Sequence, residues 1–298
     1  MPRLAALALV TGAFAAAGAL PTPVRSQTPP HAVRVVAAEN FYGDVALQIG
    51  GAGIEVTSIL GNPDQDPHLF EASPSVARAI SAARIVIHNG IDYDAWMEKL
   101  LGAARSADRT VIVVADLVGR KPGDNPHIWY DPATMLALAR TLADDLGGAD
   151  AAHRDEYRRR LAEFEASVRP IQARIAELRA RLAGTPVTAT EPVFGYMFEA
   201  LGMQVRNRSF QVSVMNDTEP SASDVAAFET DLRTHRVGLF VYNSQASDAI
   251  AARMERLARA SRIPVMGATE TEPVGKTYQA WMLGELDALD RALPKQRP

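Results

Sequence analysis

The feature that most constrains this fold is one long amphipathic segment in the middle of the chain, residues 151–182. Its apolar side chains recur at alternating spacings of four and three residues, which is the period of a helix with one apolar face. At 1.5 Å per residue, such a helix is roughly 48 Å long, which exceeds the width of an ordinary domain. The apolar stripe consists of Tyr157, Leu161, Phe164, Val168, Ile171, Ile175, Leu178 and Leu182.

Two arrangements fit this helix: a strut between two lobes of the same chain, or a coiled-coil arm in a dimer. The stripe spans about four heptads, which is enough for a short coiled coil. We favour the strut and a monomer, because the stripe can be buried against both lobes of its own chain. Pro170 lacks an N–H and its ring crowds the carbonyl of Ala166, so we expect a kink there or two helices end to end.

The stretches on either side of the helix alternate between short apolar runs and helical patterns, which is typical of parallel sheets covered by helices. They predict an α/β fold of two lobes, each with a small parallel sheet flanked by helices, joined by one long rigid helix. The N-terminal lobe is 33–150, the connecting helix 151–182 and the C-terminal lobe 183–298. The expected strands are 33–38, 54–60, 85–88, 110–114, 186–189, 204–207, 238–242 and 265–267.

Residues 1–27 have the pattern of a secretory signal peptide: Arg3, then a run rich in Ala, Leu and Val, then small residues. The run is too short and too rich in alanine to span a bilayer well, which disfavours a retained anchor. Cleavage near Ala19 and cleavage near Gln27 both fit. The chain has no cysteine, so it has no residue for a cysteine-linked lipid. We therefore expect a periplasmic protein.

Composition narrows the chemistry further. The formal net charge is −4 and the basic residues are dispersed, without interleaved aromatic residues, so no nucleic-acid partner is expected. Without cysteine there is no disulfide, no thiolate nucleophile and no thiolate metal ligand. Any metal site must therefore use imidazole nitrogen and carboxylate oxygen.

Four such side chains follow predicted strands. His68 and His127 lie in the loops after the second and fourth strands, each directly after a proline that stiffens the backbone. Glu191 and Glu270 come directly after strands of the second half. Because ligands of parallel sheets bind beyond the carboxyl ends of the strands, the cleft between two such lobes is the expected site. The four residues predict a metal cage with two ligands from each lobe.

Taken singly, these residues have ordinary interpretations as well. A histidine before an apolar residue is commonly a surface residue, and a glutamate at a helix N-terminus is favoured by the helix dipole. Glu272, two residues beyond Glu270, is a competing fourth ligand. Asp66 and Asp131 are candidates to accept a hydrogen bond from a ligand imidazole.

Four segments carry a resemblance to a known family: DPHLFEASPS at 66–75, NPHIWYDP at 125–132, TEPVFGYM at 190–197 and TETEPVGKTYQAWM at 269–282. With the charged central helix, they resemble the metal-binding substrate-binding proteins of bacterial ABC importers for zinc and manganese, the group that includes the streptococcal manganese-binding lipoproteins. The resemblance runs from about residue 33 to the last helix. It implies two α/β lobes joined by one long helix.

The resemblance also implies a ligand set and a function. It maps the metal ligands onto His68, His127, Glu191 and Glu270. It implies a periplasmic receptor, not an enzyme, that binds a divalent metal as its transported ligand between the lobes. The receptor would deliver this ion to the permease of an ABC importer and its ATPase, touching the inner membrane only at the permease.

Two departures from the family bear on the metal. Zinc members usually carry a third histidine where this chain has Glu191, and the manganese pattern usually has Asp where this chain has Glu270. Two imidazoles and two bidentate carboxylates give up to six donors, which suits Mn²⁺, although Zn²⁺ lies higher in the affinity series. We therefore favour Mn²⁺ as cargo, with Zn²⁺ second.

Two other functions use the same features. A metal-dependent hydrolase also builds its site from histidine and carboxylate, but it needs an open coordination position and a nearby base. Four protein ligands would close the site. A surface adhesin is the other alternative, and loss of growth in metal-poor medium rather than loss of attachment would distinguish the receptor from it.

Histidine ligation predicts a pH dependence of metal binding. Ligand imidazoles must be neutral, so metal affinity should fall as the pH drops through about 6.5, the ordinary pKa of histidine. Titration calorimetry at pH 7.5 and pH 5.5 measures this directly. Equal affinity at both values would contradict histidine ligands.

Overall fold

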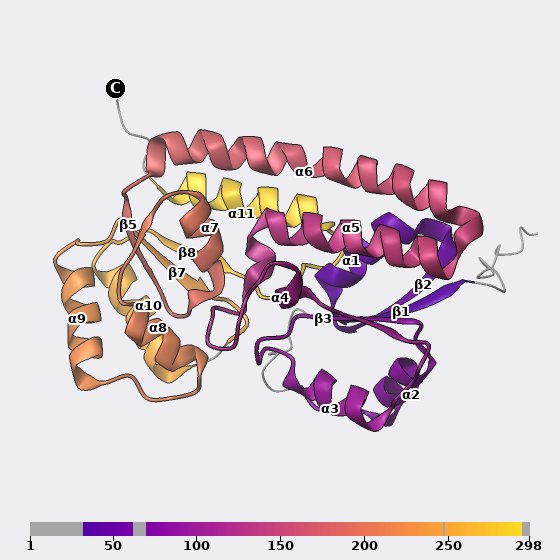
Figure 1. Cartoon of the computed structure of the whole chain (residues 1–298). Helices are drawn as coiled ribbons and strands as arrows, with labels where there is room; N and C mark the ends of the chain where they lie inside the picture. The colour runs from indigo at the N-terminus through magenta and orange to yellow at the C-terminus, as the bar shows by residue number, and fades with distance from the viewer. Residues whose placement is uncertain (1–31, 62–69, 247, 294–298) are drawn as a thin grey trace, which may run out of the picture.

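The computed structural model describes residues 32–61, 70–246 and 248–293, which form two lobes side by side (Figure 1). The predicted signal peptide, Asp66 and His68 lie outside the described residues. The first sheet has the order β2-β1-β3-β4 and the second the order β6-β5-β7-β8, and every neighbouring pair is parallel. The predicted α/β fold with two parallel sheets is therefore confirmed. The strands are β1 Val33–Glu39, β2 Ile54–Leu60, β3 Ile85–His88, β4 Thr110–Val113, β5 Pro186–Ala189, β6 Gln204–Val205, β7 Leu239–Asn243 and β8 Val265–Ala268.

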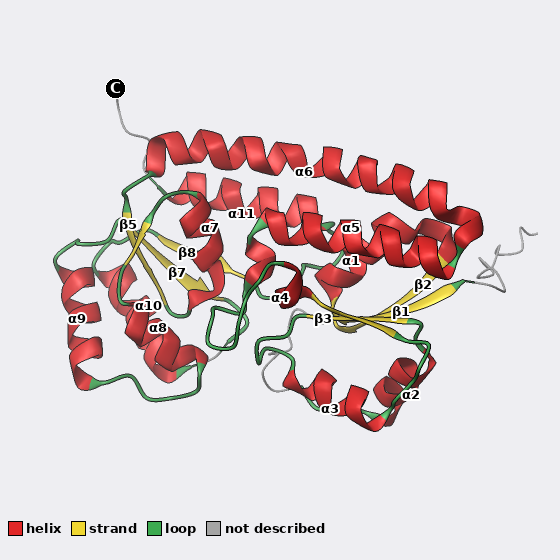
Figure 2. Ribbon diagram, viewed as in Figure 1, coloured by secondary structure: helices red, strands yellow, loops and turns green. Residues whose placement is uncertain are grey.

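Helices cover these sheets and connect their strands (Figure 2). Two of them were not predicted, because the run 110–114 was expected to be a strand to its end and 208–215 was given no element. Ser and Val are mediocre helix formers, but the second of these helices buries Phe210 against Phe228 of the next helix, and this packing outweighs the propensity. The helices are α1 Asn40–Gly50, α2 Pro74–Ala82, α3 Ala95–Ala103, α4 Val114–Leu117, α5 Pro132–Ala149, α6 Arg154–Leu182, α7 Gly195–Ala200, α8 Arg208–Met215, α9 Ala222–Arg233, α10 Ala249–Ala260 and α11 Tyr278–Ala292.

The long helix α6 runs without a break from Arg154 to Leu182, so the expectation of two helices end to end is wrong. Pro170 lies inside it, on the solvent side, while its neighbours Val168 and Ile171 are buried. Because Pro170 has no N–H, the carbonyl one turn before it has no helical partner. This carbonyl faces water, which keeps the cost of the missing hydrogen bond low.

The apolar stripe of α6 is buried within its own chain. It packs on α5 and α1 of the first lobe and on α11, and its buried side chains join one continuous core with both sheets. The face that a coiled-coil partner would need is therefore occupied, which argues against the dimer arm. In Figure 1, α6 extends over both lobes as the strut interpretation predicts.

A group of aromatic side chains ties α11 to the first lobe; we call Phe41, Trp129, Tyr130 and Trp281 the aromatic seam. Trp281 of α11 lies 5.8 Å from Phe41 and 5.5 Å from Tyr130, measured between ring centroids. Phe41 and Trp129 are 4.7 Å apart. All four are buried. Such contacts contribute about 0.5–1.5 kcal/mol per pair beyond the area they bury, so the seam fixes how the lobes meet.

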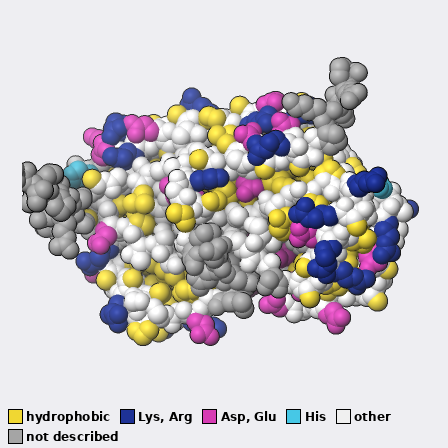
Figure 3. All heavy atoms as spheres, turned by 180° about the vertical axis from the view of Figure 1, so that it is seen from behind, with side chains coloured by type: hydrophobic (Ala, Val, Ile, Leu, Met, Phe, Trp, Pro, Cys, Tyr) yellow, Lys and Arg dark blue, Asp and Glu magenta, His cyan; other side chains and the backbone are white. Residues whose placement is uncertain are grey.

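The surface carries charges of both signs. Along the upper edge, where α6 lies, acidic and basic side chains stand next to one another (Figure 3). Arg159 and Glu156 of α6 form one such pair at 2.7 Å, and Arg174 of α6 reaches Asp290 of α11 at 2.7 Å. Among the described residues, no helix combines the length and apolarity that crossing a bilayer requires.

The burial of the α6 stripe predicts its contribution to stability. Leu178 is fully buried in the second half of α6, and Leu178→Ala should lower the free energy of unfolding by about 2–5 kcal/mol. Leu47→Ala is the matched control, because Leu47 lies on α1 with 50% of its surface exposed and should change stability by about 0.5 kcal/mol or less. Urea titration of both variants measures the difference, and equal losses would show that the stripe is not part of the core.

Candidate metal centre

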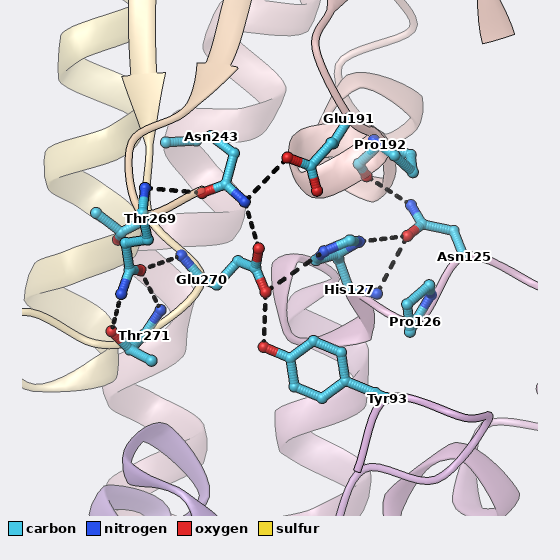
Figure 4. Close-up of polar contacts among 12 residues, drawn as sticks. Tyr93, Asn125, Pro126, His127, Glu191, Pro192, Asn243, Thr269, Glu270 and Thr271 are labelled. Atoms are coloured by element: carbon cyan, nitrogen blue, oxygen red, sulfur yellow. Dashed lines mark hydrogen bonds and ion pairs between the residues drawn. The ribbon is translucent and has the colours of Figure 1, made fainter. Parts of the chain in front are cut away.

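The second lobe brings three polar side chains to the carboxyl edge of its sheet. Glu191 lies two residues beyond β5, Asn243 is the last residue of β7, and Glu270 lies two residues beyond β8. Opposite them is the loop of the first lobe that carries Asn125 and His127 (Figure 4). These residues therefore lie at one junction between the lobes. This junction is beyond the carboxyl ends of the strands, where ligands of parallel sheets bind.

His127 is fully buried and its ring is oriented by Asn125. The ring nitrogen Nδ1 lies 2.7 Å from Oδ1 of Asn125, and the main-chain N–H of His127 donates to the same oxygen at 3.1 Å. A neutral ring that donates from Nδ1 keeps its lone pair on Nε2, and Nε2 lies 3.9 Å from Oε2 of Glu270. This is the tautomer that a metal-binding histidine needs.

Asn125, rather than the candidate Asp131, lies next to Nδ1 of His127. Asp131 instead accepts the main-chain N–H of Ala133 at 2.9 Å and caps α5. A carboxylate at the start of a helix is held by the free N–H groups there, so Asp131 is committed to the helix rather than to the ring. Asn125 takes the place next to Nδ1.

Asn125 also joins the two lobes. Its Nδ2 donates to the carbonyl of Pro192 at 2.7 Å, directly beside Glu191, and the hydroxyl of Tyr196 donates to the Asn125 carbonyl at 2.7 Å. Gly195 makes this approach sterically feasible, because a Cβ at that position would lie 2.7 Å from Nδ2 of Asn125. The same side chain therefore orients His127 and fixes the segment that carries Glu191.

Glu270 is fully buried and held on both sides. Its Oε2 accepts the hydroxyl of Tyr93 at 2.8 Å, and its Oε1 accepts the side-chain amide of Asn243. The main-chain N–H groups of Glu270 and Thr271 both donate to Oε1 of Gln245, at 2.6 and 2.9 Å. Burial raises the pKa of Tyr93 well above its ordinary value, and the nearby Glu270 raises it further, so Tyr93 remains a donor.

Glu191 is joined to this group through Asn243. The Asn243 amide lies 3.3 Å from Oε1 of Glu191 and also donates to Glu270, so one amide group connects two buried carboxylates. Two buried carboxylates that share one neutral donor repel each other unless a proton or a cation lies between them. A proton on one of these groups or on the neighbouring His127, or a bound cation, would relieve this repulsion.

The main chain of Glu272, the competing fourth ligand, is hydrogen-bonded to Asn40 of the first lobe. Its main-chain N–H donates to Asn40 at 3.0 Å and its carbonyl accepts from Asn40 at 2.7 Å. Burial, together with the charge of Asp44, raises the pKa of Glu272 to about 9, so the carboxyl is protonated at neutral pH. The main chain of Glu272 is thus bonded to Asn40, whereas the carboxylate of Glu270 lies next to His127.

The described residues contain only part of the predicted cage. His127 and Glu270 form a pair, and Glu191 joins them through Asn243, while His68 lies outside the described ranges. Within those ranges, no three His, Cys, Asp or Glu side chains form a group that could hold a metal ion. His88, the last residue of β3, has its Nδ1 3.3 Å from Oδ1 of Asp94.

Sequence reasoning missed three residues of this site: Tyr93, Asn125 and Asn243. Asn243 lies at the end of a strand, close to where the predicted ligands follow theirs, so the same strand-end criterion would have found it if amides had been counted with carboxylates. Asn125 stands two residues before His127, the spacing at which an Asn side chain bonds its own following backbone. Nothing in the sequence singled out Tyr93.

Comparison with known proteins gives a consistent result. The family model of the zinc-uptake complex component A periplasmic proteins (ZnuA) matches residues 35–292. The chain is 22% identical over 284 residues to the manganese ABC transporter substrate-binding lipoprotein PsaA of Streptococcus pneumoniae, covering 88% of this chain and 90% of PsaA. It is likewise 22% identical to the iron ABC transporter substrate-binding lipoprotein MtsA of Streptococcus pyogenes, covering 88% of this chain and 89% of that protein.

Solved structures share the fold. The periplasmic zinc-binding protein TroA from Treponema pallidum superimposes with a TM-score of 0.75 at 17% identity, over 89% of this chain and all of TroA. The manganese-bound periplasmic metal-binding protein of Candidatus Liberibacter asiaticus gives a TM-score of 0.70 at 18% identity, over 88% of this chain and all of that protein.

The different surroundings of Glu270 and Glu272 predict different effects of mutation. Glu270→Gln should weaken metal binding by more than ~100-fold, because it removes a charge beside His127. This loss is larger than the one typical of residues that only hydrogen-bond to a metal ligand. Glu272→Gln should change affinity by less than ~10-fold, because Glu272 already carries a proton. Competition titration with a chelating dye compares the two isosteric variants. A larger loss in Glu272→Gln would identify Glu272 as the ligand.

Proposed function

This chain belongs to the zinc-uptake complex component A family of periplasmic proteins, and on that premise we propose that it captures a divalent transition metal ion between its lobes and delivers it to an ABC importer. The proposed ligands are His68 and His127 from the first lobe and Glu191 and Glu270 from the second. The proposed partners are the permease and its ATPase, and the proposed compartment is the periplasm.

One observation supports this proposal most: a buried imidazole of one lobe faces buried carboxylates of the other. Nε2 of His127 lies 3.9 Å from Oε2 of Glu270, and Asn243 connects Glu270 to Glu191. An ion at that junction would replace repulsion between the carboxylates with attraction to both, in a place shielded from water. These side chains are ones that a metal ion would attract to one point. Binding of an ion is therefore a more direct function for the site than catalysis or adhesion.

The choice of metal depends on how the carboxylates bind. The relatives are named for manganese, iron and zinc, so the fold is compatible with several ions. If Glu191 and Glu270 each gave two oxygens, the set would approach the six donors that suit Mn²⁺; with one oxygen each, it would be a four-donor set that suits Zn²⁺. Selectivity between the two metals therefore reduces to carboxylate denticity.

The architecture supports release by local movement rather than by wide opening. Helix α6 spans both lobes, α11 runs along it, and the aromatic seam lies between the lobes. Bending the lobes apart would break all of this packing, whereas a local shift of the segment that carries His127 would break mainly the bonds of Asn125 to Pro192 and Tyr196. We propose that the ion leaves through a local movement of the segment that carries His127.

The function is tested in the native periplasm. The protein, purified without an affinity tag that leaches nickel, should contain about one equivalent of manganese or zinc by elemental analysis, and deletion of its coding sequence should reduce growth in metal-poor medium. The parent chain should restore growth and His127→Gln should not, because the amide lacks the imidazole donor. Rescue by His127→Gln, or a protein free of both metals, would contradict the proposal.

A further inference from the structure

Gln245, two residues beyond the end of β7, is hydrogen-bonded to the segment that carries Glu270. Its side-chain oxygen Oε1 accepts the main-chain N–H groups of Glu270 and Thr271, at 2.6 and 2.9 Å. Its Nε2 donates to Oγ1 of Thr271 at 2.8 Å. Only the oxygen end of an amide can accept two N–H groups, so these contacts fix which end of the side chain faces the main chain.

The carboxyl ends of β7 and β8 are joined to each other up to Gln245. The main-chain N–H and the hydroxyl of Ser244 both donate to the carbonyl of Ala268, the last residue of β8, at 2.9 and 3.0 Å. The main-chain N–H of Gln245 donates to Oδ1 of Asn243 at 3.0 Å. Both strands have ended at this point, and the side chain of Gln245 supplies the acceptor that a neighbouring strand would otherwise provide.

The peptide group between Thr269 and Glu270 is held at both of its polar atoms. Its N–H donates to Gln245 of the second lobe, and its carbonyl, that of Thr269, accepts the hydroxyl of Tyr130 of the first lobe at 2.7 Å. Because a peptide group is planar, bonds at its two opposite edges set its orientation, and with it the direction in which the Glu270 side chain leaves the backbone. That direction brings Oε2 of Glu270 to 3.9 Å from Nε2 of His127 (Figure 4).

Burial makes these bonds necessary. Glu270 and Thr271 are 0% and 1% exposed, so their N–H groups have no bulk water to bond to if the Gln245 oxygen is removed. The segment would then turn toward other acceptors, because an unpaired buried N–H group costs more free energy than a small change of backbone angles. Such a turn would move the Glu270 carboxylate relative to His127.

We propose that Gln245 is the positioning residue of Glu270: it holds two consecutive main-chain N–H groups and thereby keeps the Glu270 carboxylate directed at the first lobe for metal binding. Gln245 acts through the backbone of Glu270 and not as a ligand. The proposal rests on the proposed metal-binding function and deepens it by naming a residue that preorganises one of the carboxylates.

The experiment replaces Gln245 in the full mature chain. Gln245→Met keeps the length of the side chain and removes the acceptor, whereas Gln245→Glu keeps an acceptor oxygen of the same reach. In the metal-free protein, amide hydrogen exchange followed by NMR should be faster at Glu270 and Thr271 in Gln245→Met than in the parent, and as slow as in the parent in Gln245→Glu. Zn²⁺ affinity, measured by competition titration with a chelating dye, should fall by about 10–100-fold in Gln245→Met and by less than about 10-fold in Gln245→Glu.

A double-mutant cycle separates positioning from general support. If Gln245 acts through the carboxylate of Glu270, adding Gln245→Met to Glu270→Gln, which lacks that carboxylate, should lower the Zn²⁺ affinity by less than about 3-fold further. The matched control is Gln211→Met, because Gln211 is also a side-chain amide of the second lobe but donates to the carbonyl of Arg206 at 2.7 Å. It should leave the Zn²⁺ affinity and the exchange at Glu270 unchanged.

Several results would overturn the proposal. Unchanged exchange at both amides in Gln245→Met would show that the bonds do not hold the segment, and faster exchange with unchanged Zn²⁺ affinity would show that they do not set the carboxylate. The same loss of affinity in Gln245→Met and Gln245→Glu, or with and without the Glu270 carboxylate, would show that Gln245 only supports the local structure. These results leave the proposed function standing, whereas a parent that does not bind Zn²⁺ would overturn that function and this proposal with it.

Discussion

The aromatic seam between the lobes is the interaction on which the site depends. Trp129 and Tyr130 directly follow the loop of His127, and the Tyr130 hydroxyl donates to the carbonyl of Thr269 at 2.7 Å, one residue before Glu270. Trp281 of α11 closes the seam from the other side. The packing that joins the lobes therefore also sets the separation between the imidazole and the carboxylate. A substitution in the seam would move both members of the site at once.

Most of the fold could be predicted because its periodicities are strong. The stripe of α6 and the strand runs in both halves reflect burial, which sequence patterns record directly. The failures came where tertiary context outweighs local preference. Helix α8 forms from weak helix formers because Phe210 is buried, and α6 passes through Pro170 because that residue faces water. Neither circumstance can be seen in a stretch of sequence considered by itself.

The site could be predicted only as a set of charged candidates. Ranking residues by strand end and by charge indicated His127, Glu191 and Glu270, and the structure brings these to one junction, while their role as ligands remains a prediction. The neutral amides were missed because they carry no charge to attract notice. Asn125 and Asn243 nevertheless decide which nitrogen and which oxygens face the junction. Such roles depend on contacts across the lobes, which sequence spacing does not encode.

Helix α6 and the segment before α11 connect the lobes twice. The main-chain N–H of Tyr278, at the start of α11, donates to Asp44 of the first lobe at 2.9 Å, and α11 then runs along α6. On the local release proposed above, a body braced in this way would have nearly the same outline with and without its metal ion. An importer that recognises the protein by its overall shape would bind metal-free copies as readily as metal-loaded ones. Surplus metal-free protein would then act as a competitive inhibitor of metal uptake. Producing more of the protein would slow import once the metal ion became scarce.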